Sequence, residues 1–311
     1  MPGFYTNHLR SYNAKKCAPI IEDAYSKAET LDGKTTTVEI QLKAPNATQD
    51  ILSAGYAVLR DHPEFFYYNA ALSASSDGLT TCLTTDLLYS PKMIAQYKES
   101  ISNEVNRICS LMNPTWTKWD KEKFIFEHLQ STVEYVDDGK SERFNIVGAL
   151  LERKAVCEGI SKAFAVLCHA VGIPCIVVFS KTHMWNLVNI NGVLCNVDAT
   201  YGTGSSIGIN YTYFNTSDKY MDKEHEKELE CIPKCQDDAE GYYAHIGTFF
   251  ENEKDLKRYL LKNLIFTSKT AHVKLKTGNI EKTVESAIGL IPRPFKYSIN
   301  HSANTAIIKT S

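Results

Sequence analysis

Asparagine followed by glycine at positions 191 and 192 separates two runs of β-forming residues, and this pair constrains the fold more than any other feature. The run before it is His-Met-Trp-Asn-Leu-Val-Asn-Ile (183–190), and the run after it is Val-Leu-Cys-Asn-Val-Asp-Ala-Thr (193–200). Asn-Gly favours the two-residue type I′ turn, because both residues tolerate positive φ. We therefore predict an antiparallel hairpin in which Ile190 pairs with Val193.

This register sorts the hairpin side chains onto two faces, because successive residues of a strand point to opposite sides. One face is almost entirely apolar and is expected to face the core, while the other carries His183, Trp185 and Asp198. Asp198 then lies opposite Trp185, and His183 is its diagonal neighbour within side-chain reach. An acid so placed can hold an imidazole in one tautomer and stabilise its cation.

An amphipathic helix is predicted before the hairpin, and it begins with a cysteine. From Cys157 to Val171 the apolar residues recur at three- and four-residue steps, and Gly172 and Pro174 end the pattern. The N–H groups and the dipole of a helix start favour an anion, so they favour the thiolate of Cys157. Cys168 lies on the apolar stripe of the same helix and is expected to serve packing alone.

A thiol at a helix start, a histidine at a strand start and a carboxylate beside that histidine are the nucleophile, base and orienting acid of covalent acyl transfer. The order of the three residue types alone carries no weight, because nine cysteines and nine histidines make some such order certain. Their predicted positions carry the argument. Cys157, His183 and Asp198 are therefore the candidate catalytic residues.

The same stretch resembles a known family. Cys157-Glu-Gly-Ile-Ser-Lys-Ala-Phe, Gly172-Ile-Pro, His183-Met-Trp-Asn and Val197-Asp-Ala-Thr are similar to motifs of the transglutaminase-like superfamily of cysteine enzymes. Within it they are most similar to bacterial relatives of the kyphoscoliosis peptidase and cytokinesis-protein type. The resemblance is strongest over residues 120–200, and no motif extends it to the last 60 residues.

The resemblance implies an α+β fold with a papain-like, transglutaminase-like core, in which the nucleophile helix packs on an antiparallel sheet. It implies Cys157 as nucleophile, His183 as general base and acid, and Asp198 as orienting residue, with Trp185 and Gly159 lining the substrate cleft. It implies a protein or peptide substrate, and neither a cofactor nor a metal. The backbone N–H of Cys157 is the first expected oxyanion donor, and the second is unassigned.

The triad does not choose among three functions. Hydrolysis of protein or peptide amides, as in a peptidase or deamidase, is favoured because water needs no second binding site. Cross-linking by a transglutaminase with an amine acceptor uses the same thioester. A non-catalytic protein-binding module could keep the fold and use the cleft for a partner.

Composition and charge exclude several other classes. Lys and Arg total 34 against 36 Asp and Glu, a formal charge of −2, whereas a nucleic-acid binder usually shows a basic excess. No apolar run approaches the 18 residues of a membrane span. The first 30 residues hold no signal-peptide core, which predicts a cytoplasmic location, with a secreted or wall-associated protein as the alternative if the chain was trimmed. The oligomeric state is left open.

The chain is expected to divide into an N-terminal α/β accessory region (1–90), a catalytic core (91–250) and a C-terminal α/β segment (251–311). Further predicted elements are strands at 35–42, 63–68, 272–276 and 295–299 and helices at 47–60, from 91, from about 120 and at 280–290.

Three weaker signals favour ordinary structure. Residues 202–208 contain three glycines but lack a following helix, so they are interpreted as a flexible loop. The charge run 222–230 is interpreted as a solvated surface. His225, Cys231, Cys235 and His245 are poorly spaced for a zinc site.

Overall fold

The computed structural model describes residues 1, 3–31, 36–266 and 270–310. Within them the chain forms two compact units. The first unit contains residues 1–115 and 136–177, and the second contains residues 116–135 and 178–311. Helices combine with mainly antiparallel sheets, which confirms the predicted α+β class. The division at residues 90 and 250 stays a prediction.

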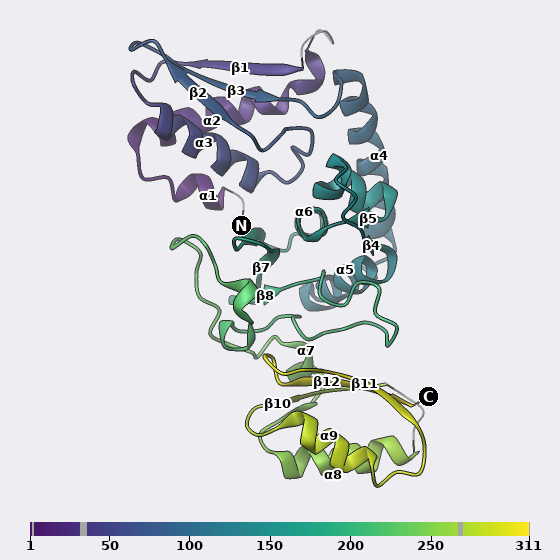
Figure 1. The fold of residues 1–311 in the computed structure, drawn as a ribbon. Helices are drawn as coiled ribbons and strands as arrows, with labels where there is room; N and C mark the ends of the chain where they lie inside the picture. The colour runs from purple at the N-terminus through teal and green to yellow at the C-terminus, as the bar shows by residue number, and fades with distance from the viewer. Residues whose placement is uncertain (2, 32–35, 267–269, 311) are drawn as a thin grey trace. The chain divides into compact units, whose positions relative to one another are not determined.

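The first unit begins with a three-stranded antiparallel sheet of order β1-β3-β2 and two long helices that contact each other (Figure 1). Alternate residues of β1 are buried, so one face of the sheet packs on the helices. The elements are α1 (Phe4–Asn7), α2 (Tyr12–Ser26), η1 (Ala28–Thr30), β1 (Thr37–Leu42), α3 (Thr48–Asp61), β2 (Ser73–Ser76) and β3 (Thr81–Asp86). The predicted strand at 35–42 is confirmed from residue 37; its residue 35 lies outside the described residues.

The strand predicted at 63–68 is wrong. This segment forms turns, with a single bridge between Tyr68 and Leu87. Phe66, Tyr67 and Tyr68 are buried, and the hydroxyls of the two tyrosines both donate to the Tyr25 carbonyl oxygen, at 3.0 and 3.2 Å. Aromatic content indicates burial, and here it accompanies a turn.

Two helices of the first unit carry predicted patterns. α4 (Pro91–Ser110) begins at the predicted residue and buries Ile94, Ile101 and Ile108 along one face. α6 (Cys157–Ala170) begins at the predicted cysteine and buries Cys168. Between them lie η2 (Ser141–Phe144), the π-helix η3 (Gly148–Glu152) and β5 (Lys154–Ala155), and β6 (Cys175–Phe179) follows α6.

The second unit begins with α5 (Lys118–Thr132), which follows a capping box. Thr117 Oγ1 accepts the Asp120 N–H at 3.1 Å, and Asp120 Oδ2 accepts the Thr117 N–H at 3.0 Å. These two bonds satisfy amide groups that a helix start leaves without intrahelical partners. The predicted helix start near residue 120 is confirmed within two residues.

The predicted hairpin is present as β7 (Met184–Ile190) and β8 (Val193–Val197), in a sheet of order β6-β7-β8. Ile190 pairs with Val193 and Asn186 with Val197, so the register is the predicted one. Asn191 has φ 53° and Gly192 has φ 91°. Two successive positive φ angles are those of the type I′ turn that Asn-Gly favours.

Both faces of this hairpin are buried. Trp185 and Asn196, on the face opposite the one predicted to lie on the core, have no exposed surface. The chain after β8 folds back over this face, and Asn196 exchanges backbone hydrogen bonds with Thr216, both at 3.0 Å. Residues far along the chain therefore cover Asp198 and its surroundings.

The C-terminal part of the second unit is a four-stranded sheet of order β11-β12-β10-β9, with two helices along one face (Figure 1). Apolar residues of both helices and of the sheet form one buried cluster. The predicted strands at 272–276 and 295–299 and the helix at 280–290 are confirmed, whereas β9 and β12 were not predicted. The remaining elements of the second unit, in chain order, are β4 (Glu134–Tyr135), η4 (Asp218–Tyr220), η5 (Lys223–His225), α7 (Tyr242–His245), β9 (Phe249–Phe250), α8 (Glu253–Phe266), β10 (Ala271–Leu275), α9 (Ile280–Ile288), β11 (Phe295–Asn300) and β12 (Thr305–Thr310).

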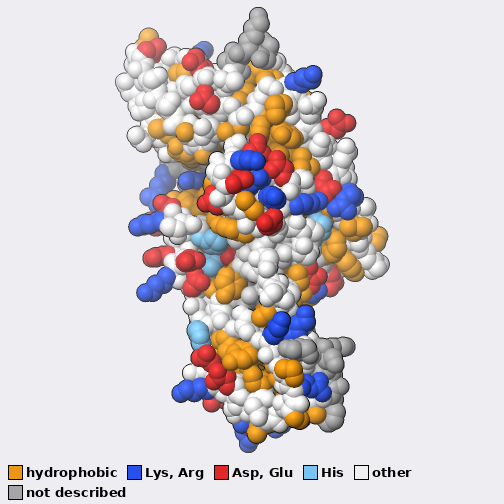
Figure 2. All heavy atoms as spheres, turned by 45° about the vertical axis from the view of Figure 1, so that its right-hand side comes forward, with side chains coloured by type: hydrophobic (Ala, Val, Ile, Leu, Met, Phe, Trp, Pro, Cys, Tyr) orange, Lys and Arg blue, Asp and Glu red, His pale blue; other side chains and the backbone are white. Residues whose placement is uncertain are grey.

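Among the described residues, no helix has the length and apolar character needed to cross a membrane. On the face drawn in Figure 2, acidic and basic side chains of the described residues lie intermixed, as the near-zero net charge suggests.

Candidate active site

His183 lies one residue before β7, where a tight turn fixes its backbone. The Ser180 N–H donates to the His183 carbonyl oxygen at 2.9 Å, and Ser180 Oγ accepts the His183 N–H at 3.0 Å. The side chain keeps 16% of its surface exposed. The imidazole is therefore anchored at its base and still partly accessible.

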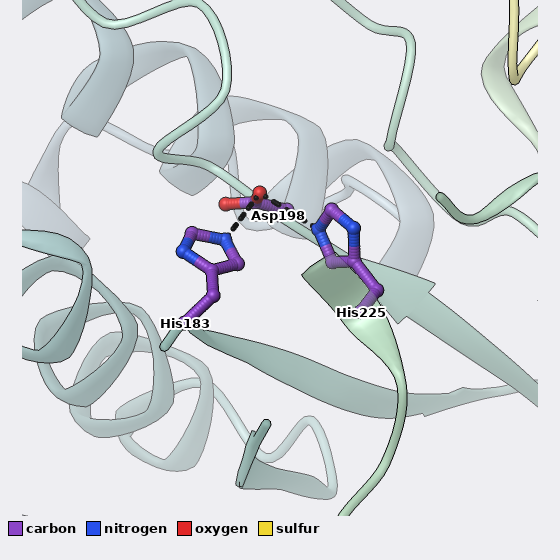
Figure 3. Close-up of side chains that lie close together, drawn as sticks. All are labelled: His183, Asp198 and His225. Carbon is purple, nitrogen blue, oxygen red and sulfur yellow. Dashed lines mark hydrogen bonds and ion pairs between the residues drawn. The ribbon is translucent and has the colours of Figure 1, made fainter. Parts of the chain in front are cut away.

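Asp198 follows β8 and is almost fully buried. Its backbone N–H donates to the Tyr213 carbonyl oxygen at 2.9 Å, and its Oδ1 accepts the Thr200 N–H at 2.8 Å. Its Oδ2 accepts from His183 Nε2 at 2.9 Å (Figure 3). The predicted diagonal contact between His183 and Asp198 is thus present in the second unit.

A second histidine, which the sequence interpretation left outside the site, binds the same carboxylate oxygen. His225, at the end of η5, places Nε2 3.1 Å from Asp198 Oδ2 and Nδ1 2.7 Å from Asp222 Oδ1 (Figure 3). The charge run around it was expected to be solvated, yet His225 is buried. One local signal could have indicated this: Asp222 caps the 3-10 helix η5 through the Glu224 N–H, at 3.0 Å, three residues before the histidine.

The electrostatics of the site follow from these contacts. Burial alone raises the pKa of Asp198, but the hydrogen bonds and charges of His183 and His225 outweigh it, so the pKa lies well below its usual range. Burial likewise raises the pKa of Asp222, and its hydrogen bonds with Tyr213 and His225 lower it overall. Both carboxyl groups are therefore anionic at neutral pH.

Asp198 also decides which nitrogen of His183 can act as a base. An ionised carboxylate only accepts hydrogen bonds, so His183 Nε2 carries the proton in this contact. The neutral ring then has its basic lone pair on Nδ1. This is the tautomer that a histidine held by an acid presents to a nucleophile.

Trp185 and Gly159, expected to line a substrate cleft, are both buried. The Trp185 indole N–H donates to Asn196 Oδ1 at 3.1 Å, and its ring lies edge-on to the His225 ring. A Cβ on Gly159 would lie 2.5 Å from the Arg143 carbonyl oxygen, so close packing of α6 already requires glycine there. Substrate contact by either residue stays a prediction.

Cys157 is the first residue of α6, as predicted, and is a half-buried free thiol. Val156 precedes it with an extended backbone and provides no side-chain cap, so the amide groups of the first turn are not occupied by a capping side chain. Cys157 belongs to the first unit and His183 to the second. The pairing of the thiol with the imidazole stays a prediction.

His183, Asp198 and His225 are also the one group of His, Cys, Asp and Glu side chains, among the residues that the structure describes, whose polar atoms could surround a metal ion. Hydrogen bonds of 2.9 and 3.1 Å already link both imidazoles to Asp198 Oδ2. These contacts account for the cluster as a hydrogen-bonded network, so we assign no metal to it. The weak zinc set considered from sequence contributes only His225 to this cluster.

Comparisons with known proteins agree with the sequence motifs. Residues 106–199 match the family model described as the transglutaminase-like superfamily. No curated protein matches the chain.

Two solved structures resemble parts of the chain. One, titled as a crystal structure of a TGase, has 15% identity and a TM-score of 0.32 over 53% of this chain and 52% of that chain. A putative cysteine protease from Cytophaga hutchinsonii has 16% identity and a TM-score of 0.27 over 42% of this chain and 56% of that chain. The chain thus spans about half the length of each.

The family match covers the helix that begins with Cys157 and the hairpin that bears His183 and Asp198. Residues 106–199 of this chain are thus similar to the transglutaminase-like superfamily, as their motifs indicated.

Proposed function

We propose that this protein is a cysteine-dependent enzyme that transfers acyl groups from protein or peptide amides. Cys157 is the nucleophile, His183 the general base and acid, and Asp198 the orienting residue. The observation that carries the proposal is the 2.9 Å hydrogen bond between His183 Nε2 and a buried, ionised Asp198. The start of α6 at Cys157 supports it, because a helix N-terminus favours the thiolate.

The reaction begins when the Cys157 sulfur attacks the amide carbonyl and His183 Nδ1 holds the thiol proton. The tetrahedral intermediate collapses as His183 gives this proton to the leaving amine, so the C–N bond breaks and a thioester remains. Asp198 stabilises the imidazolium throughout, because its Oδ2 accepts the ring N–H. The backbone N–H of Cys157 is the proposed first donor to the oxyanion.

The acceptor that resolves the thioester defines the activity. We propose water, because hydrolysis needs no second binding site. A peptide substrate incubated with a fluorescent primary amine distinguishes the outcomes: release of acid without label supports hydrolysis, and covalent incorporation of the amine establishes transglutamination.

The reactivity of the thiols tests whether the site is catalytic at all. Cys157 should react with iodoacetamide near neutral pH at least about tenfold faster than Cys82 and Cys231, which are also half-buried. Mass spectrometry after short labelling gives the three rates in one sample. Equal rates would favour the non-catalytic binding module.

Cys157→Ala should abolish turnover while changing the melting temperature little, since the half-buried thiol fills no core position. Cys168→Ala is the matched control on the same helix, because Cys168 is fully buried. It should lower stability and keep turnover per folded molecule. A large stability loss in Cys157→Ala, with activity retained by the folded fraction, would contradict the assignment.

A further inference from the structure

The proposed reaction uses three side chains and leaves a fourth, at the centre of the same network, without a role. His225 is 6% exposed, and its ring contacts those of His183, Trp185 and Tyr213, with centroids 4.8–5.0 Å apart. Both of its nitrogens face carboxylate oxygens, of Asp198 and Asp222 (Figure 3 shows the contact with Asp198). A side chain that only filled space would not require two acidic partners.

These contacts determine the charge of the ring. A neutral imidazole donates through one nitrogen and accepts through the other, whereas an imidazolium donates through both. Ionised carboxylates can only accept, and Asp198 and Asp222 both favour the ionised form. Only the cation satisfies both contacts, so His225 forms a positive bridge between two acids.

The bridge bears directly on the proposed catalytic base, because His183 and His225 donate to the same oxygen, Asp198 Oδ2. The remaining oxygen, Oδ1, accepts the Thr200 N–H. With these three donors, the carboxylate cannot rotate without breaking a hydrogen bond. His225 therefore helps to fix the oxygen against which the His183 ring is aligned.

The second consequence concerns charge. A buried carboxylate with no other partner would strongly stabilise the His183 imidazolium. The ring would then transfer its proton less readily. A neighbouring cation offsets part of this attraction, because charges act over longer distances in a poorly solvated site. The other groups that face His225 are Asp222, the Tyr213 hydroxyl, which donates to Asp222 at 2.7 Å, and the Trp185 ring.

We propose that His225 is a positioning residue which, as a cation between Asp198 and Asp222, aligns Asp198 with His183 and keeps the proton of His183 transferable. The proposal rests on the proposed function, in which His183 moves a proton between thiol and amine. In this proposal His225, which lies 27 residues beyond Asp198 in the sequence, influences the proton transfer of the catalytic base His183.

Titration of the histidine rings tests the proposal without any substrate. We would follow ring signals by NMR in the full chain carrying Cys157→Ala, and compare it with the same protein carrying His225→Gln. Glutamine keeps a neutral donor near Asp198 and removes the positive charge. The titration midpoint of His183 should rise by about one pH unit, the size of shift that one nearby charge causes.

His272→Gln is the matched control. His272 is a mostly buried histidine of β10 in the same unit, with ring contacts to Tyr211 and Tyr242 instead of the site. It should leave the His183 midpoint unchanged. A His183 midpoint that is equally unchanged in His225→Gln would overturn the proposal.

A measurement on the protein without any change at His225 covers the case in which His225→Gln fails to fold. The nitrogen chemical shifts of His225 at pH 7 should be those of a doubly protonated ring. A neutral His225 at that pH would also overturn the proposal.

In the active enzyme, the limb of the kcat/KM–pH profile that belongs to His183 should move to higher pH in His225→Gln, with KM unchanged. The kinetic and titration measurements together separate the proposed function from the proposed role of His225. If no turnover is found with any amide, the proposed function fails while the ring titrations still decide the role of His225. If Cys157→Ala abolishes turnover and the titrations are unchanged, only the role of His225 fails.

Discussion

Asp198 and Glu122 are both buried carboxyl groups of the second unit, with 2% and 0% of their surface exposed, yet they are shifted in opposite directions. The pKa of Asp198 lies well below its usual range. Burial raises the pKa of Glu122 to about 8. The same removal from water therefore leaves one group ionised and the other protonated at neutral pH.

The difference lies in the hydrogen-bond donors around each group. Asp198 accepts from two imidazoles and one backbone N–H. Glu122, in α5, accepts at Oε2 from the Asn215 amide at 2.8 Å, and its Oε1 has no hydrogen-bond partner among the described residues. Burial penalises charge in both places, and the two imidazoles at Asp198 outweigh the penalty, whereas the neutral Asn215 amide at Glu122 does not. This difference supports the proposed role of Asp198 as the orienting acid, whereas Glu122 has no part in the proposed reaction.

Removing the charge at Asp198 should have the largest effect. Asp198→Asn should lower kcat/KM by about a hundredfold or more, because the amide no longer fixes the tautomer of His183. It should also lower the free energy of unfolding at pH 7 by about 3 kcal/mol, since it removes the charged partner of the buried His225 and of the partly buried His183. Steady-state kinetics and urea unfolding measure the two losses.

The pH dependence of unfolding gives a second measurement on the same variant. A lowered pKa means that Asp198 contributes stability above its unfolded-state pKa of 3.8, and that this stability is lost as the pH falls through the folded-state value. Asp198→Asn should therefore lose less stability than the parent on acidification below pH 4. If Asp198→Asn kept its activity and lost stability below pH 4 as steeply as the parent, Asp198 and Glu122 would not differ in the way described.

Glu122→Gln should change stability in the opposite direction and by less. The unfolded chain releases the Glu122 proton near pH 4.5, whereas the folded chain keeps it to about pH 8, so stability falls as the pH rises between these values. Glutamine removes this penalty. At pH 7 the raised pKa of Glu122 costs the parent about 3 kcal/mol, and burying the new amide costs the variant about 1 kcal/mol. The variant should therefore be more stable by about 2 kcal/mol.

Thermal unfolding from pH 4 to pH 8 measures this effect as a difference in slope. Near pH 4 the parent should be the more stable by about 1 kcal/mol, the cost of the buried amide. It should lose stability relative to Glu122→Gln as the pH rises, so that the two curves cross near pH 5. Parallel curves would mean that Glu122 is ionised in the folded protein.

Asn215→Gly should have the smallest effect. Asn215 has φ 53°, which glycine adopts without strain, so the change removes the buried side chain with its amide donor and leaves the backbone unstrained. The cost should be about 1 kcal/mol at pH 5, where Glu122 is neutral, and it should grow toward pH 8 because the ionised form loses its one donor. A cost that is constant across this range would show that the Asn215 amide does not act on the charge of Glu122.

The most accurate sequence predictions concerned features set by neighbouring residues. Asn191 and Gly192 both take positive φ angles, so they fixed the hairpin register and hence the meeting of His183 with Asp198. The start of α5, predicted near residue 120, is likewise set locally, by the capping box of Thr117 and Asp120. The errors arose from tertiary contacts: the aromatic run at 63–68 forms turns, and His225, within the charge run expected to be solvated, is buried.

The sequence alone determined the helix that begins at Cys157, the hairpin and its register, because backbone conformation at turns and helix starts depends on the residues in place. Only the tertiary structure decided that His225 lies against Asp198, that Asp222 completes the bridge and that Trp185 is covered. Those contacts arise where the chain folds back on itself between residues 211 and 225, and no short-range pattern encodes which distant side chain will reach a buried acid.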